Sequence, residues 1–442
     1  MLCPLKINNN NFKALIMTKV SSEFISEIKV RGFIHQATDL NKLDSILSKN
    51  KPQTGYIGFD CTAKSLHVGS LMQIMLLRWF QKTGHRPIVL LGGGTTLIGD
   101  PSGKDESRKL LNVKTISINS KNIKKVFEKF INFKENSQSA LMINNAEWLT
   151  KLSYIEFLRD FGKHFSVNRM LNFDSVKLRL EREQTLSFLE FNYMILQAYD
   201  FLELNRQYGC ILQMGGSDQW GNIVNGVELN RRVSASSSKS EELYGLTSPL
   251  ITNSSGGKMG KTEKGAIWLD PELLSPWEYW QFWRNTADQD VSKFLKLFTE
   301  IDIGEINKLE KLAGEEINEA KKVLATEATA LLHGRQSAEK SENTGKHLFE
   351  KIGDENFLPK VYIDYEILDK KISILDLFLM NNLLSSKSEA RRLIRGGGAK
   401  INDKVIKNES LLVDKSFFTS SNDIKLSAGK KRHIRIIFKK NN

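Results

Sequence analysis

The chain contains 442 residues, enough for several domains with cores of their own. Apolar residues make up 40% and charged residues 26%, which is typical of a globular protein and argues against a disordered or fibrous chain. No apolar run approaches the roughly 20 residues that a membrane-spanning helix needs, so we expect no membrane partner. The three cysteines share no ligand spacing, which favours a reducing, cytoplasmic location over a disulfide framework or a zinc site.

The net charge of +13 is concentrated near the C-terminus. Residues 372–442 contain 15 Lys or Arg against 6 Asp or Glu. A concentrated basic segment indicates a polyanionic partner, most often a nucleic acid, although a merely solubilising surface has the same composition.

The N-terminal part predicts a strand–helix–strand unit. Residues 1–20 contain an Asn run and read as a disordered tail. Tyr56–Phe59 is the first strand, residues 70–81 form an apolar helix, and residues 87–91 form a buried strand. This pattern is typical of a doubly wound parallel sheet of the Rossmann-like type. His67–Ser70 opens the helix, where free backbone N–H groups suit a phosphate chain, although a capping histidine would explain the same residues.

Three glycine-rich turns follow strands or apolar segments. The turn over residues 92–104 fits neither a Walker phosphate loop nor a dinucleotide fingerprint, but it follows a strand, where open sheets bind ligands. A second turn covers residues 215–222. The third, residues 256–262, places two lysines between glycines and could close on a polyphosphate.

A long apolar helix over residues 186–204 carries polar side chains on one face. Tyr193, Gln197 and Asp200 are spaced at i, i+4 and i+7. They either line a pocket for a small ligand or are satisfied polar residues of the core.

The basic C-terminal segment predicts a compact module. Ser386 and Glu389 form a capping box, so a helix should begin at Lys387. Its stripe of Lys387, Arg391, Arg392 and Arg395 ends at three glycines and is followed by a hairpin over residues 399–406. A basic helix beside a small sheet suits recognition of folded RNA by shape and charge.

Together these motifs resemble class I aminoacyl-tRNA synthetases, specifically the bacterial-type tyrosyl-tRNA synthetases, over about residues 21–438. His67–Ser70 is similar to the family's first signature and Lys258–Thr262 to its second. Ser70 and Gly260 depart from the general class I consensus at positions where tyrosyl enzymes vary.

The resemblance implies roles for single residues. Tyr56 and Asp200 would hold the phenol oxygen of the substrate. The implied tyrosine-binding residues are Tyr56, Asp100, Tyr193, Gln197, Asp200 and Gln213. The implied ATP-binding residues are Asp60, His67, Gly69, Ser70, Asp218, Gln219, Lys258 and Lys261. Catalytic stabilisation of phosphate charge is implied for Thr62, His67, Lys258, Lys261 and Thr262, with assistance to pyrophosphate from Lys104 and Arg108.

The resemblance also implies a domain order. Residues 21–262 would form the catalytic domain with a helical insertion near 148–184, used for dimer contact. Residues 263–350 would form an α-helical anticodon-binding domain, 351–371 a linker, and 372–442 a small α+β RNA-binding domain of the S-four type.

The implied reaction activates L-tyrosine with ATP and transfers tyrosine to the 3′ end of tRNA(Tyr). The tyrosine carboxylate attacks the α-phosphate, so positioning and charge stabilisation replace a protein nucleophile. ATP would enter with Mg²⁺, no protein-bound metal or organic cofactor is expected, and a homodimer is implied. Two interpretations remain open beside it: a tryptophanyl-type synthetase, which would not call for the Tyr56/Asp200 pair, and a non-enzymatic RNA-binding protein, which would explain only the basic C-terminus.

Overall fold

The chain divides into two compact units, Met1–Ser341 and Glu342–Asn442. A computed structural model describes residues 20–100, 111–134, 138–236, 241–252, 254, 259–262, 265–349, 360–364, 371–381, 383–418, 423–429 and 432–439. The predicted tail therefore lies outside the described residues, apart from residue 20. None of the described helices is long and apolar enough to cross a membrane.

A six-stranded sheet forms the centre of the first unit. In spatial order its strands are β1 (Gln36–Ala37), β6 (Tyr244–Ser248), β5 (Cys210–Gly216), β2 (Thr54–Asp60), β3 (Arg86–Gly92) and β4 (Leu141–Asn144). All neighbours are parallel except β1, which runs antiparallel to β6. The sequence predicts β2 to β5 from their apolar runs. It gives no comparable signal for β1, which has only two residues, or for β6, whose short run contains Gly and Ser.

The order of the strands reverses between β2 and β5. The chain continues from β2 to β3 and β4 on one side, and from β5 to β6 on the other. Tyr56 of β2 lies opposite Gln213 of β5 in the register. In open parallel sheets, ligands bind at such a switch point, beyond the carboxyl ends of the strands.

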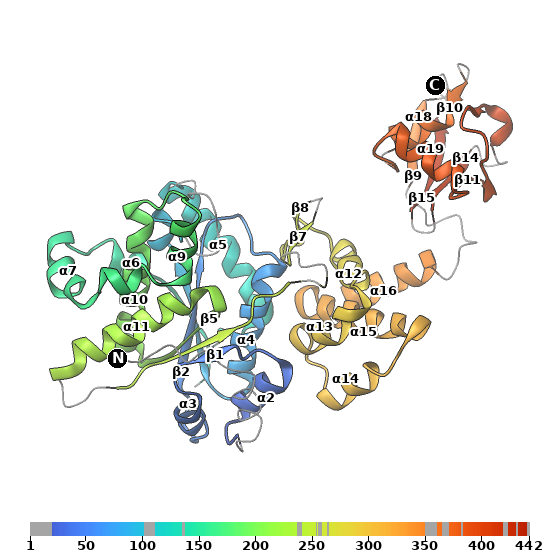
Figure 1. Cartoon of the computed structure of the whole chain (residues 1–442). Helices are drawn as coiled ribbons and strands as arrows, with labels where there is room; N and C mark the ends of the chain where they lie inside the picture. The colour runs from blue at the N-terminus through green and yellow to red at the C-terminus, as the bar shows by residue number, and fades with distance from the viewer. Residues whose placement is uncertain are drawn as a thin grey trace. The chain divides into compact units, whose positions relative to one another are not determined.

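Helices cover both faces of this sheet, with α4 and α5 on one side and α10 and α11 on the other (Figure 1). Burial on both faces explains why β3 and β5 are continuous apolar runs. The helices of this part are α2 (Glu23–Arg31), α3 (Leu40–Leu47), α4 (Leu71–Lys82), α5 (Val113–Phe130), α6 (Ala146–Leu149), α7 (Tyr154–Asp160), α8 (Val167–Met170), α9 (Asp174–Glu181), α10 (Phe188–Tyr208) and α11 (Trp220–Val233).

The segment 148–184, predicted as helical, consists of short helices joined by turns. The predicted helix over residues 186–204 differs in its bounds. Helix α10 begins after a complete capping box of Ser187 and Glu190 and runs to Tyr208, because Gly209 ends it with φ +60°.

The rest of the first unit is helical. It contains β7 (Lys261–Thr262), β8 (Gly265–Ala266), α12 (Pro276–Arg284), α13 (Val291–Phe298), α14 (Ile303–Leu309), α15 (Ile317–His333) and the first turns of α16 (Arg335–Phe349). These helices share one hydrophobic core with the sheet. Arg31 of α2, only 3% exposed, donates to the carbonyls of Lys296, Thr299 and Ile301 at the end of α13. The predicted helical region is therefore packed into the same unit as the sheet, and its role as a separate domain stays a prediction.

The second unit is a small α+β module. Its elements are β9 (Lys360–Asp364), β10 (Ile372–Ser373), α18 (Ile374–Met380), α19 (Lys387–Arg395), β11 (Ala399–Ile401), β12 (Lys404–Val405), β13 (Leu412–Val413), β14 (Asp423–Ala428) and β15 (Arg432–Lys439). The helix predicted at Lys387 and the hairpin turn at Asn402–Asp403 are confirmed; both turn residues have positive φ.

One prediction for this module is wrong in part. Residues 351–371 were expected to be a linker, but β9 pairs in parallel with β15 at the edge of a five-stranded sheet. The partner strand lies more than 70 residues further along the chain, and a single five-residue strand gives no local sign of such a distant pairing.

Candidate active site

A cavity of about 380 Å³ opens at the switch point of the six-stranded sheet. Its size suits a small-molecule ligand. Every predicted tyrosine-binding residue lines it: Tyr56, Asp100, Tyr193, Gln197, Asp200 and Gln213. Seven predicted nucleotide-site residues line it as well: Asp60, Thr62, His67, Gly69, Ser70, Asp218 and Gln219. The structure thus brings together residues that are spread over more than 160 positions of the sequence.

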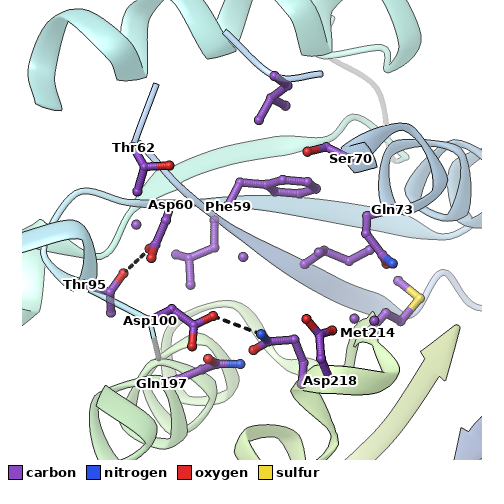
Figure 2. A pocket seen from close by; sticks show the side chains of 18 of the residues that line it. Phe59, Asp60, Thr62, Ser70, Gln73, Thr95, Asp100, Gln197, Met214 and Asp218 are labelled. Atoms are coloured by element: carbon purple, nitrogen blue, oxygen red, sulfur yellow. Dashed lines mark hydrogen bonds between the residues drawn. The ribbon is translucent and has the colours of Figure 1, made fainter. Parts of the chain in front are cut away.

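Figure 2 shows how polar side chains from several elements surround this space. Asp60 and Thr62 come from the end of β2 and the turn after it, and Ser70 and Gln73 come from the start of α4. Asp100 and Asp218 approach from the opposite side, together with Gln197 of α10. Strand ends and helix starts therefore supply most of the polar groups.

At one end of the cavity, Asp200 lies in a buried hydrogen-bond network. It is 2% exposed. The indole Nε1 of Trp148 donates to its Oδ1 at 2.7 Å, and Nδ2 of Asn145 donates to its Oδ2 at 2.9 Å. Burial raises the pKa of Asp200 to about 7, although both hydrogen bonds lower it. The pKa of Asp200 therefore lies close to neutral pH, and two hydrogen-bond donors fix the orientation of its carboxyl group.

Two further polar atoms at this end have no hydrogen-bond partner among the described residues. They are the hydroxyl of Tyr56 and Oε1 of Gln213. Burial, followed by the charge of Asp200, raises the pKa of Tyr56 well above its usual value, so the hydroxyl keeps its proton. Buried groups without partners are rare and cost about 1–3 kcal/mol each, so a polar ligand group is expected to satisfy them.

Asp60 lines the same cavity and accepts two hydrogen bonds. Its Oδ1 accepts from Thr95 at 2.8 Å, and its Oδ2 accepts from the hydroxyl of Tyr193 at 3.1 Å. Gly92 at the end of β3 makes room for this pair, because a Cβ there would lie 2.2 Å from Oδ1 of Asp60. The glycine-rich turn thus allows close approach of a carboxylate.

A chain of amides crosses the cavity on its other side. Nε2 of Gln219 donates to Asp100 at 3.0 Å, as Figure 2 shows. Nδ2 of Asn222 donates to Oε1 of both Gln197 and Gln219, at 3.0 and 3.1 Å. These bonds fix which atoms of the amides face the cavity.

The start of α4 forms the other end of the cavity. His67 is the N-cap of a short 3-10 turn over residues 68–70, and its Nδ1 accepts from the N–H of Gly69 at 3.0 Å. The hydrogen of the neutral ring is therefore on Nε2, which can donate to an anion. Helix α4 begins at Leu71, one residue after the predicted start.

Gly260, in the glycine-rich turn predicted over residues 256–262, packs against this helix start. Gly260 has φ +94°, and a Cβ on it would lie 2.8 Å from the N of Gly69 and 2.9 Å from Nδ1 of His67. Trp268 forms a β-bridge with His67 on the same side. The two predicted signatures, almost 200 residues apart, are thus adjacent in the fold.

Comparisons with known proteins identify the family. Residues 48–350 match the model for tRNA synthetases class I (W and Y), and residues 375–416 match the S4 domain. The tyrosine–tRNA ligase of Methylocella silvestris is 55% identical over 417 residues, which cover 93% of this chain and 97% of that protein. That of Rhodospirillum rubrum is 56% identical over 420 residues, covering 95% and 99%.

The chain belongs to the tyrosine–tRNA ligase family.

Solved structures agree with this membership. A C-terminally truncated mitochondrial tyrosyl-tRNA synthetase from Aspergillus nidulans is 31% identical with a TM-score of 0.67, over 76% of this chain and 97% of that one. A tryptophanyl-tRNA synthetase from Encephalitozoon cuniculi, at 13% identity and a TM-score of 0.52 over 79% and 98%, shares the fold alone. The predicted fold class and the predicted enzyme class are confirmed, and the interpretation as a non-enzymatic RNA-binding protein is wrong.

Some residues that the family resemblance singled out lie outside the described residues. These are Lys104, Arg108 and Lys258, together with the side chains of Lys261 and Thr262, whose backbone forms β7. No cluster of three or more His, Cys, Asp or Glu suited to a metal occurs in the described part of the chain.

Several residues that line or support the cavity are not among the predicted site residues. Thr95, Asn145 and Gln73 line it, and Trp148 supports Asp200 from behind. Asn145 directly follows β4 at the carboxyl edge of the sheet, and this position was the one available signal. Trp148 looked like an ordinary apolar helix residue, because only the tertiary fold brings its indole N–H to Asp200.

The predicted RNA-binding stripe lies on α19 of the second unit, and acidic neighbours pair with most of it. Lys387 pairs with Asp376 at 2.6 Å, and both Arg391 and Arg395 pair with Glu409 at 3.8 and 2.5 Å. These basic side chains are about half exposed or more, so the pairs are weak and can exchange for phosphates.

Proposed function

We propose that this cavity activates L-tyrosine with ATP and then transfers the tyrosyl group to the 3′ end of tRNA(Tyr). The observation that carries the proposal is the hydroxyl of Tyr56, which finds no hydrogen-bond partner among the described residues and lines the same cavity as the buried carboxyl of Asp200. A tyrosine phenol offers one donor and one acceptor at this point, and phenylalanine offers neither. A site built to bond a hydroxyl rejects a ligand that lacks it, as tyrosyl-tRNA synthetases are known to do.

The amino group of the substrate would lie near Tyr193, Gln197, Asp100 and Gln213. Asp100 and the amide oxygens supply acceptors for an ammonium group. The tyrosine carboxylate then points along Asp60 toward the start of α4. The residues assigned to the phenol, Asp60 and His67 all line this one cavity.

The chemistry requires no protein nucleophile. The carboxylate attacks the α-phosphate of ATP, a P–O bond to the substrate forms, and the bond to pyrophosphate breaks. Nε2–H of His67, the hydroxyl of Thr62 and the helix start at Gly69–Ser70 would stabilise the developing charge, and we assign the same role to Lys258 and Lys261. ATP enters as its Mg²⁺ complex, so the metal arrives with the substrate.

The second unit would hold the tRNA through the basic stripe of α19, and the helical region would bind the anticodon. The enzyme would work as a homodimer. Large apolar side chains are exposed over α7 to the start of α10, which includes the predicted insertion, with Ile155 71% and Phe188 69% exposed. Exposed apolar surfaces of this kind mark protein interfaces. Sedimentation of wild type and Phe188→Asp tests this: a dimer that the variant splits supports it, and a monomeric wild type refutes it.

We place the enzyme in the cytoplasm, where thiols stay reduced, because the described cysteines Cys61 and Cys210 are free and buried. Amino-acid-dependent exchange of pyrophosphate into ATP tests the activity. Exchange should depend on tyrosine and be negligible with tryptophan or phenylalanine. Equal exchange with tryptophan would overturn the assignment of the pocket.

A further inference from the structure

Asp290 occupies a helix N-cap position but does not cap its helix. It precedes α13, yet no side-chain capping bond is formed there. Its Oδ2 instead accepts from the backbone N–H of Ser254 at 2.8 Å, in the segment that leads to Lys258. Asp290 is 6% exposed. An aspartate at an N-cap position normally stabilises its own helix. Because Asp290 instead bonds a segment that is distant in sequence, we infer that it has a different role.

The same helix makes a second bond to this segment. Nζ of Lys293, one turn further along α13, donates to the carbonyl of Thr252 at 3.3 Å. Beyond it, the N–H of Met259 donates to the carbonyl of Ile251 at 3.2 Å and closes the base of the turn. The entry of the turn is thus fixed on α13.

The exit of the turn is fixed at the start of α4. Gly260 packs on His67 and Gly69, and its carbonyl accepts from the N–H of Ile267 at 3.2 Å. The backbone on either side of Lys258 is therefore held at two places, by α13 and by the start of α4. A lysine stabilises the charge on a transferring phosphoryl group only when it is correctly positioned, which requires that its backbone be held in place.

We propose that Asp290 is a positioning residue for the phosphate-binding lysines, acting through Ser254 on the turn that carries Lys258 and Lys261. The inference rests on the proposed role of those lysines in ATP activation. Asp290 contacts no substrate. It holds Ser254, four residues before Lys258, on α13, so its loss should lower the rate of the chemical step and leave tyrosine binding intact.

The test compares Asp290→Ala with a matched control, Asp288→Ala. Asp288 lies in the same turn before α13, but it pairs with Lys321 and is far more exposed. In pre-steady-state adenylate formation, Asp290→Ala should lower the rate constant roughly tenfold at unchanged KM for tyrosine, the scale of one lost charge-assisted hydrogen bond. Asp288→Ala should match wild type. Asp290→Asn keeps an acceptor and should recover most of the rate. Equal rates for the two alanine variants would overturn the proposal.

A double-mutant cycle with Lys258→Ala separates this inference from the proposed function. If Asp290 acts through the lysine turn, Asp290→Ala should lower the rate less in the Lys258→Ala background than in wild type, because only Lys261 remains to be positioned. Additive losses would refute the positioning role. Lys258→Ala at wild-type rate would instead refute the proposed role of the turn. Should Asp290→Ala fail to fold, Ser254→Pro removes the N–H donor from the other side of the same bond and should give the same loss; a wild-type rate for that variant would contradict the proposal.

Discussion

Trp148→Phe removes one of the two donors that hold Asp200, and it keeps an aromatic ring in the same place. The lost bond is Nε1–H to Oδ1 of Asp200, at 2.7 Å. Asn145 still donates to Oδ2. The substitution therefore changes the electrostatics of the carboxyl more than the shape of the cavity.

The magnitude follows from the surroundings of Asp200. Burial raises its pKa to about 7, and the Trp148 bond is one of the interactions that oppose this rise. A hydrogen bond to a charged group contributes about 1.5–3 kcal/mol, and one pKa unit corresponds to about 1.4 kcal/mol. Trp148→Phe should therefore raise the pKa of Asp200 further above its wild-type value.

The sign of the pH dependence follows from the role of the carboxylate. The ionised form accepts the phenol hydrogen, so kcat/KM for tyrosine should rise with pH through the pKa of Asp200 in the free enzyme. The variant should be impaired at pH 7 and approach wild type above pH 9. Because the folded pKa lies above the unfolded value of about 3.9, the native carboxyl binds more protons, and stability should fall as the pH rises from about 4 to 7.

Tyrosine-dependent pyrophosphate exchange, measured across this pH range, checks the shift. Trp277→Phe, in the helical region away from Asp200, serves as the matched control and should keep the wild-type profile. The reasoning is refuted if Trp148→Phe lowers kcat/KM equally at every pH, because a loss of packing alone would do that.

Three further predictions concern other parts of the molecule. Gly260→Ala should slow adenylate formation about tenfold or more, since φ +94° and the approach to Gly69 both resist a Cβ; rapid-quench kinetics would show it, and a wild-type rate would contradict the packing. Arg31→Met should lower the free energy of unfolding by about 3–5 kcal/mol in urea titration, because it removes the bonds that Arg31 donates to three carbonyls and to the carboxylate of Glu27. Truncation after Phe349 keeps α16 whole and removes β9 with its sheet; tyrosyl-adenylate formation should persist while tRNA charging falls steeply, and equal loss of both would contradict the division into two units.

The sequence predicted the residues of the cavity well because they follow recognisable elements. Tyr56 and Gln213 lie on apolar strands, His67 opens an apolar helix, and Asp200 is a costly acid on another. Strand ends and helix starts have local signatures, and parallel topology brings them to one edge of the sheet. The family resemblance then supplied roles that spacing alone could not.

The supporting contacts could not be predicted in this way. Trp148 and Asn145, which follow β4, reach Asp200 of α10 only in the tertiary fold, and nothing in the local sequence marks Trp148 as a donor. Asp290 looks like a helix cap, and its bond to Ser254 depends on the tertiary fold. Strand β9 was missed for the same reason, since its pairing with β15 is distant in sequence.

The preference of Asp200→Ala for tyrosine over phenylalanine tests the central claim most directly. The claim is that this cavity reads the phenol hydroxyl through Asp200 and Tyr56. The ratio of kcat/KM values for the two amino acids, measured by pyrophosphate exchange, should fall by about 10- to 100-fold relative to wild type, because a hydrogen bond to a charged group is lost for tyrosine only. An unchanged ratio would contradict the account.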